Sequence, residues 1–556
     1  MTPAQPASAA DEGIARLDHA HALLAQGRQL DAVQVLLESV ALRPKDARMR
    51  LALAGALEGF PLDSASAAVR DILLDLCRDE NIATQCLADA VIGLAKSYPL
   101  FPRLLEACIA GRDVLGECAA EVGALVRDPL LTAVLSGAVV NDPDLERVLA
   151  QIRRCMLLRT DTESVTFEFA CALARQCFNT EYAMFAAEDE TQAVQRLQQQ
   201  VETVDERPLV LAALYAPLNR LPQWERMLQW TPESLSAAFR PIWQAQVVHY
   251  QQEREIAARI DALTPIASDV SRAVRGLYEE NPYPRWLTML RPQARALAEV
   301  VPAAAARVAA GARGAILIAG GGTGQHPIRT AMTFPDCDVV ALDLSRASLA
   351  YATRMAERFG VKNLSFAQAD ILELASWGRQ FDLIESLGVL HHMKDPLAGW
   401  RVLTGLLRAG GIMRIGLYST IARRPLQAAR EFARQSEFPG SPEGIRRCRR
   451  AILELPTEHP ARAVLTSDDF YSLSGCRDLI MHVQERSFTL PQIANCLRKL
   501  GLRCLGLHCP PEVSAAFRAT YPDPAAIADL SLWDRFEQRH PDIFRGMYLF
   551  SCARRG

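Results

Sequence analysis

Residues 316–324 have the sequence Ile316-Leu317-Ile318-Ala319-Gly320-Gly321-Gly322-Thr323-Gly324, an apolar run that passes directly into glycines. Such a run is typical of a buried strand followed by a tight turn. Because glycine has no Cβ, the backbone of this turn can approach a ligand closely. The pattern predicts a Rossmann-like α/β sheet whose first strand ends at a cofactor-binding loop.

A second apolar stretch supports a nucleotide-type cofactor. Val339-Val340-Ala341-Leu342 ends at Asp343, where a doubly wound sheet presents an acid to ribose hydroxyls. Dinucleotide-binding folds have the spacing G-x-G-x-x-G, whereas this chain has G-x-G-x-G from Gly320 and places Gln325 where the third glycine would stand. The spacing therefore disfavours NAD.

Further motifs follow in a fixed order. Asp370 closes the strand-like stretch 364–367, and residues 381–396 contain another apolar strand followed by Gly388 and the pair His391-His392. A fifth strand is expected over residues 412–418. Taken together, these motifs resemble those of class I S-adenosylmethionine-dependent methyltransferases.

The resemblance implies a seven-stranded methyltransferase domain that binds S-adenosyl-L-methionine and releases S-adenosyl-L-homocysteine. It implies that Asp343 binds the ribose hydroxyls and Asp370 the adenine amine. The family usually has an acid two residues before the first glycine, where this chain has Ile318. The other expected cofactor contacts lie in or beside the motifs: Gly320, Gly322 and Gly324 beneath the methionine part, with Leu344, Ile371 and Gly388.

Composition narrows the class of protein. The chain has 556 residues, half of them hydrophobic, which predicts two or three packed units. A formal net charge of −3 gives no basic footprint for nucleic acid, so nucleic acid is an unlikely partner. The 14 cysteines show no C-x-x-C pair, and no metal site is expected. Without a signal-like start or a long apolar run, we expect a cytoplasmic protein with no membrane contact.

The residues before the glycine loop have apolar positions at helical spacing, which predicts an all-helical domain. Residues 17–44 are similar to one tetratricopeptide (TPR) repeat, with small residues at helix contacts and a terminal Pro44. Later helical stretches, residues 128–158 and 165–185, do not hold its period, so we expect an irregular solenoid. Such a domain either supports the enzyme or binds a polypeptide on its concave face.

Residues 274–286 form an aromatic, proline-containing block between the two halves. It resembles a segment that precedes the methyltransferase core in bacterial proteins that join TPR-like helices to this enzyme fold. By that resemblance it is a lid on the cofactor cleft, with Arg285 facing the methionine carboxylate and Tyr278 or Tyr283 facing the substrate. The alternative is a hydrophobic staple between domains.

The fifth strand is followed by an unusually long interval. The helix expected at 489–500 and the strands expected at 502–507 and 547–552 would complete the sheet, so residues 419–487 form an insertion over the carboxyl ends of the strands. It contains a basic helical run, residues 423–450, which we interpret as a solvated helix face. Near its end, Asp478 and Gln484 are predicted to contact the substrate.

Methyl transfer requires alignment and, for an amine or hydroxyl acceptor, removal of a proton. The candidate catalytic side chains are those near the expected acceptor site: His391, His392, His482, Glu485 and Tyr418. One histidine of a consecutive pair is expected to pack structurally, and a lone histidine such as His482 is more often hydrogen-bonded than catalytic.

The sequence thus predicts a methyltransferase that acts on a protein or peptide recruited by the helical domain. The alternatives are a small-molecule O-, N- or C-methyltransferase, whose helices only cover the cleft or form a homodimer, and a non-catalytic scaffold, which Ile318 motivates. The expected division is a tail (1–10), a helical TPR-like domain (11–265), a lid or linker (266–295), the core (296–418), the insertion (419–487) and the end of the core (488–556).

Overall fold

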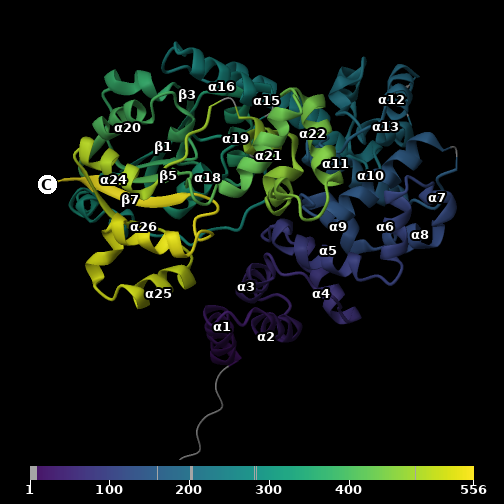
Figure 1. Ribbon diagram of the computed structural model, residues 1–556, viewed down its shortest axis with the longest axis horizontal. Helices are drawn as coiled ribbons and strands as arrows, with labels where there is room; N and C mark the ends of the chain where they lie inside the picture. The colour runs from purple at the N-terminus through teal and green to yellow at the C-terminus, as the bar shows by residue number, and fades with distance from the viewer. Residues whose placement is uncertain are drawn as a thin grey trace, which may run out of the picture.

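The computed structural model describes residues 9–159, 161–200, 205–280, 282, 285–482 and 484–555. The first half of the chain forms a helical body, and most of the second half forms a body built on one β-sheet (Figure 1). Helices α21 (Arg424–Gln435) and α22 (Pro442–Glu454) lie between the two bodies (Figure 1). Among these residues, none of the helices combines the length and the apolar character that crossing a membrane requires.

The helical body confirms the all-helical first half. One apolar core extends through it from Ala20 to Val247. Its helices are α1 (Ala9–Ala25), α2 (Gln29–Leu42), α3 (Ala47–Leu57), α4 (Ala67–Cys77), α5 (Ala88–Lys96), α6 (Phe101–Ile109), α7 (Val114–Glu117), α8 (Ala119–Val126), α9 (Pro129–Gly137), α10 (Pro143–Leu158), α11 (Phe167–Asn179), α12 (Glu188–Gln200), α13 (Glu206–Ala213), α14 (Arg240–Trp243) and α15 (His249–Arg259).

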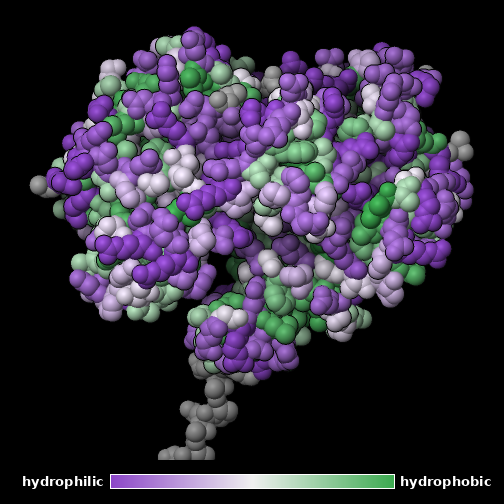
Figure 2. Space-filling model, in the orientation of Figure 1, coloured by the Kyte–Doolittle hydropathy of each residue, from purple (hydrophilic) through white to green (hydrophobic). Residues whose placement is uncertain are grey.

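Two details bear on the predicted solenoid. Helices α1 and α2 pack as a pair at the end of the molecule that projects from the rest (Figures 1 and 2). A single pair of helices does not establish a TPR repeat, which stays a prediction. The stretch 128–158 is two helices, because α9 ends at Gly137 and α10 begins at Pro143. Asp142 caps α10 by accepting a hydrogen bond from the N–H of Leu145 at 2.8 Å, so the chain reverses before that proline.

The sheet has seven strands in the order β3-β2-β1-β4-β5-β7-β6, with β1 to β5 parallel and β7 antiparallel to both of its neighbours. This confirms the predicted fold class. Its strands are β1 (Gly314–Ala319), β2 (Cys337–Asp343), β3 (Leu364–Gln368), β4 (Phe381–Leu387), β5 (Leu407–Leu417), β6 (Leu502–Leu507) and β7 (Tyr548–Arg554).

Separate apolar cores cover the two faces of the sheet. The helices around the sheet are α16 (Asp269–Glu280), α17 (Ala305–Ala309), α18 (Gln325–Thr333), α19 (Arg346–Arg358), α20 (Pro396–Gly405) and α24 (Leu490–Lys499). The interval between β5 and α24 contains α21, α22 and α23 (Leu473–Met481), with a small core of their own.

One excursion was not predicted. Between β6 and β7 the chain forms α25 (Pro511–Thr520) and α26 (Leu530–Arg539), held together by Phe517 stacked on Trp533 with ring centroids 3.6 Å apart. After this excursion Met547 reaches the cavity described below.

Candidate functional site

A cavity of about 350 Å³ lies at the carboxyl ends of β1, β2, β3 and β4. Its lining joins two groups of predicted site residues. One group is the glycine loop 320–324 with Asp343, Leu344, Asp370, Ile371 and Gly388. The other, which we call the Asp478 cluster, consists of Tyr278, His392, Tyr418 and Asp478.

The glycine loop requires glycine at its two bends. Gly320 and Gly324 both have a φ of +90°, in the left-handed region that other residues rarely adopt. A Cβ at Gly320 would collide with Val389, and one at Gly324 would collide with Ala352. The loop therefore lies tight against its neighbours and leaves its outer face to the cavity.

Asp343 ends β2 beside this loop. Its carboxylate accepts hydrogen bonds from the backbone N–H of Gly322 at 2.8 Å and of Ser345 at 3.0 Å. Burial raises the pKa of Asp343, while these N–H donors oppose that shift. Each carboxylate oxygen retains a further lone pair, so Asp343 can still accept from ligand hydroxyls.

Asp370 follows β3 and is 3% exposed. Its Oδ1 accepts from the N–H of Leu372 at 3.0 Å, and its own N–H donates to the Thr264 hydroxyl at 2.8 Å. Its Oδ2 is buried and has no hydrogen-bond partner among the described residues. Since a buried carboxylate oxygen without a donor is unfavourable, this atom is ready to accept a hydrogen bond from a ligand.

The strand next to Ile318 carries a buried acid that does not itself line the cavity. Glu385 of β4 stands in register with Ile318 and accepts from Thr330 of α18 at 2.9 Å. It also contacts His326 Nε2 at 2.9 Å and pairs with Arg414 at 2.9 Å. Burial would raise the pKa of Glu385, but His326, Arg414 and the Thr330 hydroxyl lower it to about 2. Sequence reasoning missed this residue, although its position inside an apolar strand was a signal.

Helix α16, which overlaps the predicted lid, lines the cavity, and its role as a lid stays a prediction. Glu279 accepts hydrogen bonds from the backbone N–H of Arg346 at 2.9 Å and of Ala347 at 3.0 Å, which fastens α16 to the first turn of α19. Ser268, Val270, Ser271 and Val274, none of them predicted, line the cavity from this segment.

Of the residues predicted in the lid, Arg285 lies elsewhere than predicted, and Tyr283 is outside the described residues. Arg285 does not appear in the cavity lining, because its guanidinium lies over the ring of Phe178 in the helical body, 4.0 Å from the centroid. This position does not support contact with a methionine carboxylate and fits the staple alternative for that residue. Tyr283 lies outside the described residues.

The Asp478 cluster is connected by hydrogen bonds and ring contacts. The hydroxyl of Tyr278 donates to Asp478 Oδ1 at 3.0 Å across 200 residues of sequence. His392 Nδ1 lies 2.9 Å from the carbonyl oxygen of Gln484, and since a carbonyl only accepts, Nδ1 carries the proton. In the neutral ring Nε2 is therefore the acceptor nitrogen, on a residue that lines the cavity.

Tyr418 is fixed between two side chains. Its ring centroid lies 3.9 Å from that of His391 and 3.3 Å from the guanidinium carbon of Arg423. Only the ring edge and the hydroxyl remain for the cavity. His391 is fully buried, and burial lowers its pKa well below the usual value, so it packs behind Tyr418 and does not line the cavity.

Two further catalytic candidates do not line the cavity. Glu485 pairs with Arg430 at 2.8 Å and Arg423 at 3.7 Å, so its charge is already compensated; the structure argues against a role as base. His482 stacks on His392 with ring centroids 3.9 Å apart, and its Nδ1 accepts from the N–H of Gln484 at 3.0 Å. Gln484 thus contributes backbone groups that fix both rings, whereas its side chain was predicted to contact the substrate.

Three of these groups could in principle hold a cation. Ligand atoms of His392, Asp478 and His482 lie within 4.8 Å of one another. The tautomer of His482 opposes metal binding, however. Because its Nδ1 accepts a hydrogen bond, the Nε2 of the neutral ring carries the proton, and this nitrogen lies 3.6 Å from Asp478 Oδ1, beyond hydrogen-bond distance. We therefore do not interpret the three residues as a metal site.

The insertion is fastened to the helical body at a strained turn. Glu181 and Tyr182 have φ angles of 56° and 59°, which are rare for residues other than glycine. The Glu181 carboxylate accepts from the N–H and the hydroxyl of Ser474 at 2.6 and 2.7 Å. Because Ser474 stands in the first turn of α23, the helical body holds the start of the helix that carries Asp478.

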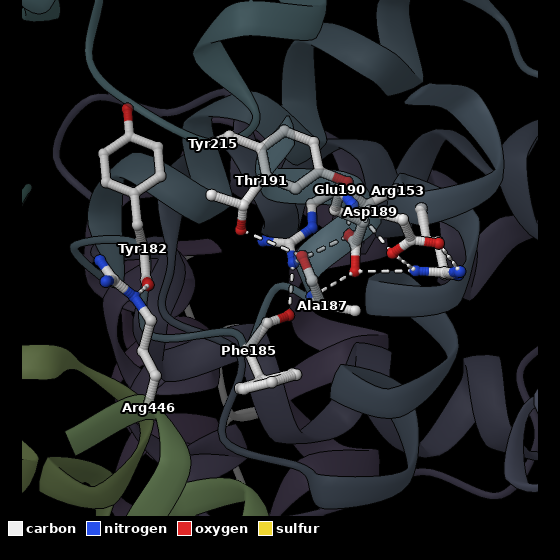
Figure 3. Close-up of polar contacts among 10 residues, drawn as sticks. Arg153, Tyr182, Phe185, Ala187, Asp189, Glu190, Thr191, Tyr215 and Arg446 are labelled. Atoms are coloured by element: carbon white, nitrogen blue, oxygen red, sulfur yellow. Dashed lines mark hydrogen bonds and ion pairs between the residues drawn. The ribbon is translucent and has the colours of Figure 1, made fainter. Parts of the chain in front are cut away.

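The basic run 423–450 is partly buried in this contact. Arg446 donates to the carbonyl oxygen of Tyr182 at 2.7 Å (Figure 3), and Arg449 donates to that of Ala183 at 2.6 Å. Arg449 is 1% exposed and also pairs with Glu146 at 2.8 Å. The prediction of a solvated face was wrong for these arginines, because carbonyls of a buried turn need donors.

Comparison with known proteins identifies the sheet body. Residues 313–441 match the family model described as a methyltransferase domain. The chain contains a class I S-adenosylmethionine-dependent methyltransferase domain. An uncharacterized protein of a Synechococcus strain is 30% identical to the chain over 200 residues, which cover 34% of this chain and 48% of that protein.

Two named proteins share parts of the chain. A ubiquinone biosynthesis O-methyltransferase of Ruegeria pomeroyi is 32% identical over 106 residues, 19% of this chain and 40% of the enzyme. The chain thus spans less than half the length of the curated relatives named here. Among solved structures, PKMT2 from Rickettsia typhi in complex with AdoHcy has a TM-score of 0.34 and 17% identity, over 43% of this chain and 48% of that one.

The methyltransferase domain has a cavity that fits its cofactor. The glycine loop leaves no room for side chains at its bends, and Asp370 Oδ2 lacks a donor among the described residues. A nucleoside with a ribose diol and an exocyclic amine supplies the donors that Asp343 and Asp370 can accept.

Proposed function

We propose that the protein is a methyltransferase that transfers a methyl group to a nitrogen or oxygen of a polypeptide acceptor. One observation carries the proposal: a single cavity is lined both by the cofactor motifs and by the Asp478 cluster. A bound cofactor and an acceptor group can therefore meet without leaving that cavity.

In this proposal the sheet body binds the cofactor. Gly320, Gly322 and Gly324 lie beneath its methionine part, Asp343 accepts from the ribose hydroxyls and Asp370 from the adenine amine. When bound, S-adenosyl-L-methionine supplies a methyl group on a sulfonium, which needs no activation by the protein. What the chain must add is alignment of the acceptor and removal of its proton.

His392 is the group we propose for proton removal. Because Nδ1 donates to Gln484, Nε2 is the acceptor nitrogen of the neutral ring, and the residue lines the cavity. The carbonyl oxygen of Gln484 also fixes the orientation of the ring. Tyr418, clamped between His391 and Arg423, orients the acceptor through its hydroxyl.

The contact between the helical body and the insertion supports a polypeptide acceptor. Glu181 holds the start of α23, and Asp478 of the same helix lines the cavity. A polypeptide bound by the helical body would thus lie on the structure that positions the acceptor site. The alternative of a small-molecule acceptor is favoured by the matched stretch shared with a ubiquinone biosynthesis O-methyltransferase.

Labelling with a radioactive methyl group separates these possibilities. The full chain is incubated with labelled S-adenosyl-L-methionine and a cell extract, and the acid-precipitated polypeptide is separated from small molecules. Label in polypeptide supports the proposal, and label confined to the small-molecule fraction favours the alternative. Cofactor binding without any transfer would support the scaffold hypothesis.

A further inference from the structure

Asp478 presents an unneutralised charge to the cavity. It is 6% exposed and lines the cavity, and its Oδ1 accepts from the Tyr278 hydroxyl. Within the described residues no lysine or arginine lies within ion-pairing distance, and its partner at 3.6 Å is His482. A buried carboxylate with hydrogen bonds but no cation is unusual, because such groups are normally paired.

The neighbouring histidine does not cancel this charge. His482 Nδ1 accepts a backbone hydrogen bond, so Nε2 of the neutral ring carries the proton, and among the described residues this nitrogen makes no hydrogen bond to Asp478. Burial, together with the nearby His392, lowers the pKa of His482 to about 3, so the ring is neutral at physiological pH. Lys394 also lines the cavity, but its exposed side chain makes no ion pair with Asp478.

The rest of the Asp478 cluster offers acceptors. Nε2 is the acceptor nitrogen of the neutral His392 ring, and Tyr418 lines the cavity with a clamped ring that carries a hydroxyl. A carboxylate, an imidazole nitrogen and a phenol oxygen around one space match a ligand rich in N–H donors. An anionic or purely apolar group would leave the Asp478 charge buried and unpaired.

We propose that the Asp478 cluster is a binding site for a primary or secondary ammonium group, so that the acceptor is an amine. This inference rests on the proposed function and narrows its acceptor class. The ammonium donates to Asp478, and one N–H proton passes to His392 Nε2. The freed nitrogen lone pair forms the new N–CH₃ bond, the C–S bond breaks with its electron pair remaining on sulfur, and a methylated ammonium and a thioether result.

The test uses the full chain saturated with S-adenosyl-L-homocysteine and titrated with n-butylammonium or with n-butanol, its neutral counterpart of similar shape. We expect butylammonium to bind about tenfold more tightly or better, since a hydrogen bond to a charged group is involved. Asp478→Asn should reduce butylammonium affinity to that of butanol. Asp468→Asn removes an exposed carboxylate of the same insertion, bonded to Asn141, and should leave the preference intact.

Binding of S-adenosyl-L-homocysteine by each variant shows that the domain is folded and separates the two ideas. A chain that does not bind this cofactor product contradicts the proposed function and the inference with it. A chain that binds it but prefers butanol, or that keeps its preference in Asp478→Asn, overturns only the amine site. Tyr278→Phe provides a graded check, because it removes one donor to Asp478 and should leave the ammonium bound with altered affinity.

Discussion

The two groups of residues that line the cavity are built in different ways. The cofactor motifs come from one continuous part of the chain, where consecutive strands β1 to β4 end side by side. The Asp478 cluster comes from α16, from the turn after β4, from the end of β5 and from α23. Its central hydrogen bond joins Tyr278 and Asp478, which are 200 positions apart.

The difference separates local from long-range determinants. The cofactor motifs need only the sheet, whose strand order fixes them. The Asp478 cluster depends on the insertion and, through Glu181, on the helical body. Changes in the helical body should therefore affect methyl transfer while leaving cofactor binding intact, and the following predictions test that separation.

The largest effect is expected at His392. His392→Gln removes the proposed base but keeps a polar side chain near Gln484, so kcat should fall by about 10² to 10⁴-fold. The Kd for S-adenosyl-L-homocysteine should stay nearly unchanged. Turnover is measured on the acceptor fraction found by labelling. A wild-type kcat in this variant would show that His392 is not the base.

A smaller effect is expected at Glu181, a positioning residue in the helical body. Glu181→Ala deletes both hydrogen bonds to Ser474, so kcat/KM should fall about tenfold, with cofactor affinity retained. Glu181→Gln keeps one acceptor and should recover part of the loss. Glu188→Ala, on the exposed start of α12, is the matched control. If Glu181→Ala lost cofactor binding together with turnover, the cofactor motifs and the Asp478 cluster would not be separable.

The smallest effect is an acid sensitivity of the Asp478 side of the cavity. The pKa of His482 is about 3 in the folded chain against an ordinary value of 6.5, so below pH 6.5 the unfolded chain takes up a proton that the folded chain does not. Stability should fall as pH decreases from 6.5. When the pH falls from 7.5 to 5.5, the free energy of unfolding should decrease by about 1 kcal/mol less in His482→Gln than in wild type. Urea titrations at the two pH values measure this difference.

Glu385 differs from His482 in that its charged form is stabilised by folding, and it titrates at a lower pH. Its pKa of about 2 lies below the ordinary 4.5, so its stabilising contribution is complete above pH 4.5 and disappears only as pH falls toward 2. Glu385 should therefore contribute no change in stability between pH 7.5 and 5.5. A loss of stability across that range that is as large in His482→Gln as in wild type would contradict the assignment of the acid effect to His482.

The sequence predicted the cofactor motifs better than the Asp478 cluster, which is assembled from distant parts of the chain. The glycine loop, the four parallel strands before β5 and the positions of Asp343 and Asp370 follow from motifs that short-range geometry fixes. Arg285 and Glu485 do not line the cavity, and their partners, Phe178 and Arg430, come from other parts of the chain, which the local sequence does not indicate.

Other features also needed tertiary structure. Strand register places Glu385 beside Ile318, and the apolar strand around it signals only that this acid is buried, not which residue it neighbours. The excursion through α25 and α26 is placed by aromatic stacking between segments of the fold. The break between α9 and α10 was the exception, since Pro143 after Asp142 signals a helix start that the apolar spacing concealed.

Calorimetric titration of the full chain with S-adenosyl-L-methionine and S-adenosyl-L-homocysteine tests the central claim, that this cavity is a methyltransferase cofactor site. We predict binding by the wild-type chain, loss of at least about tenfold in affinity in Asp343→Ala because hydrogen bonds to a charged group are lost, and retained affinity in Asp338→Ala, an exposed carboxylate of the same strand. A folded wild-type chain that binds neither compound, or an Asp343→Ala variant that binds as tightly as wild type, would contradict the account.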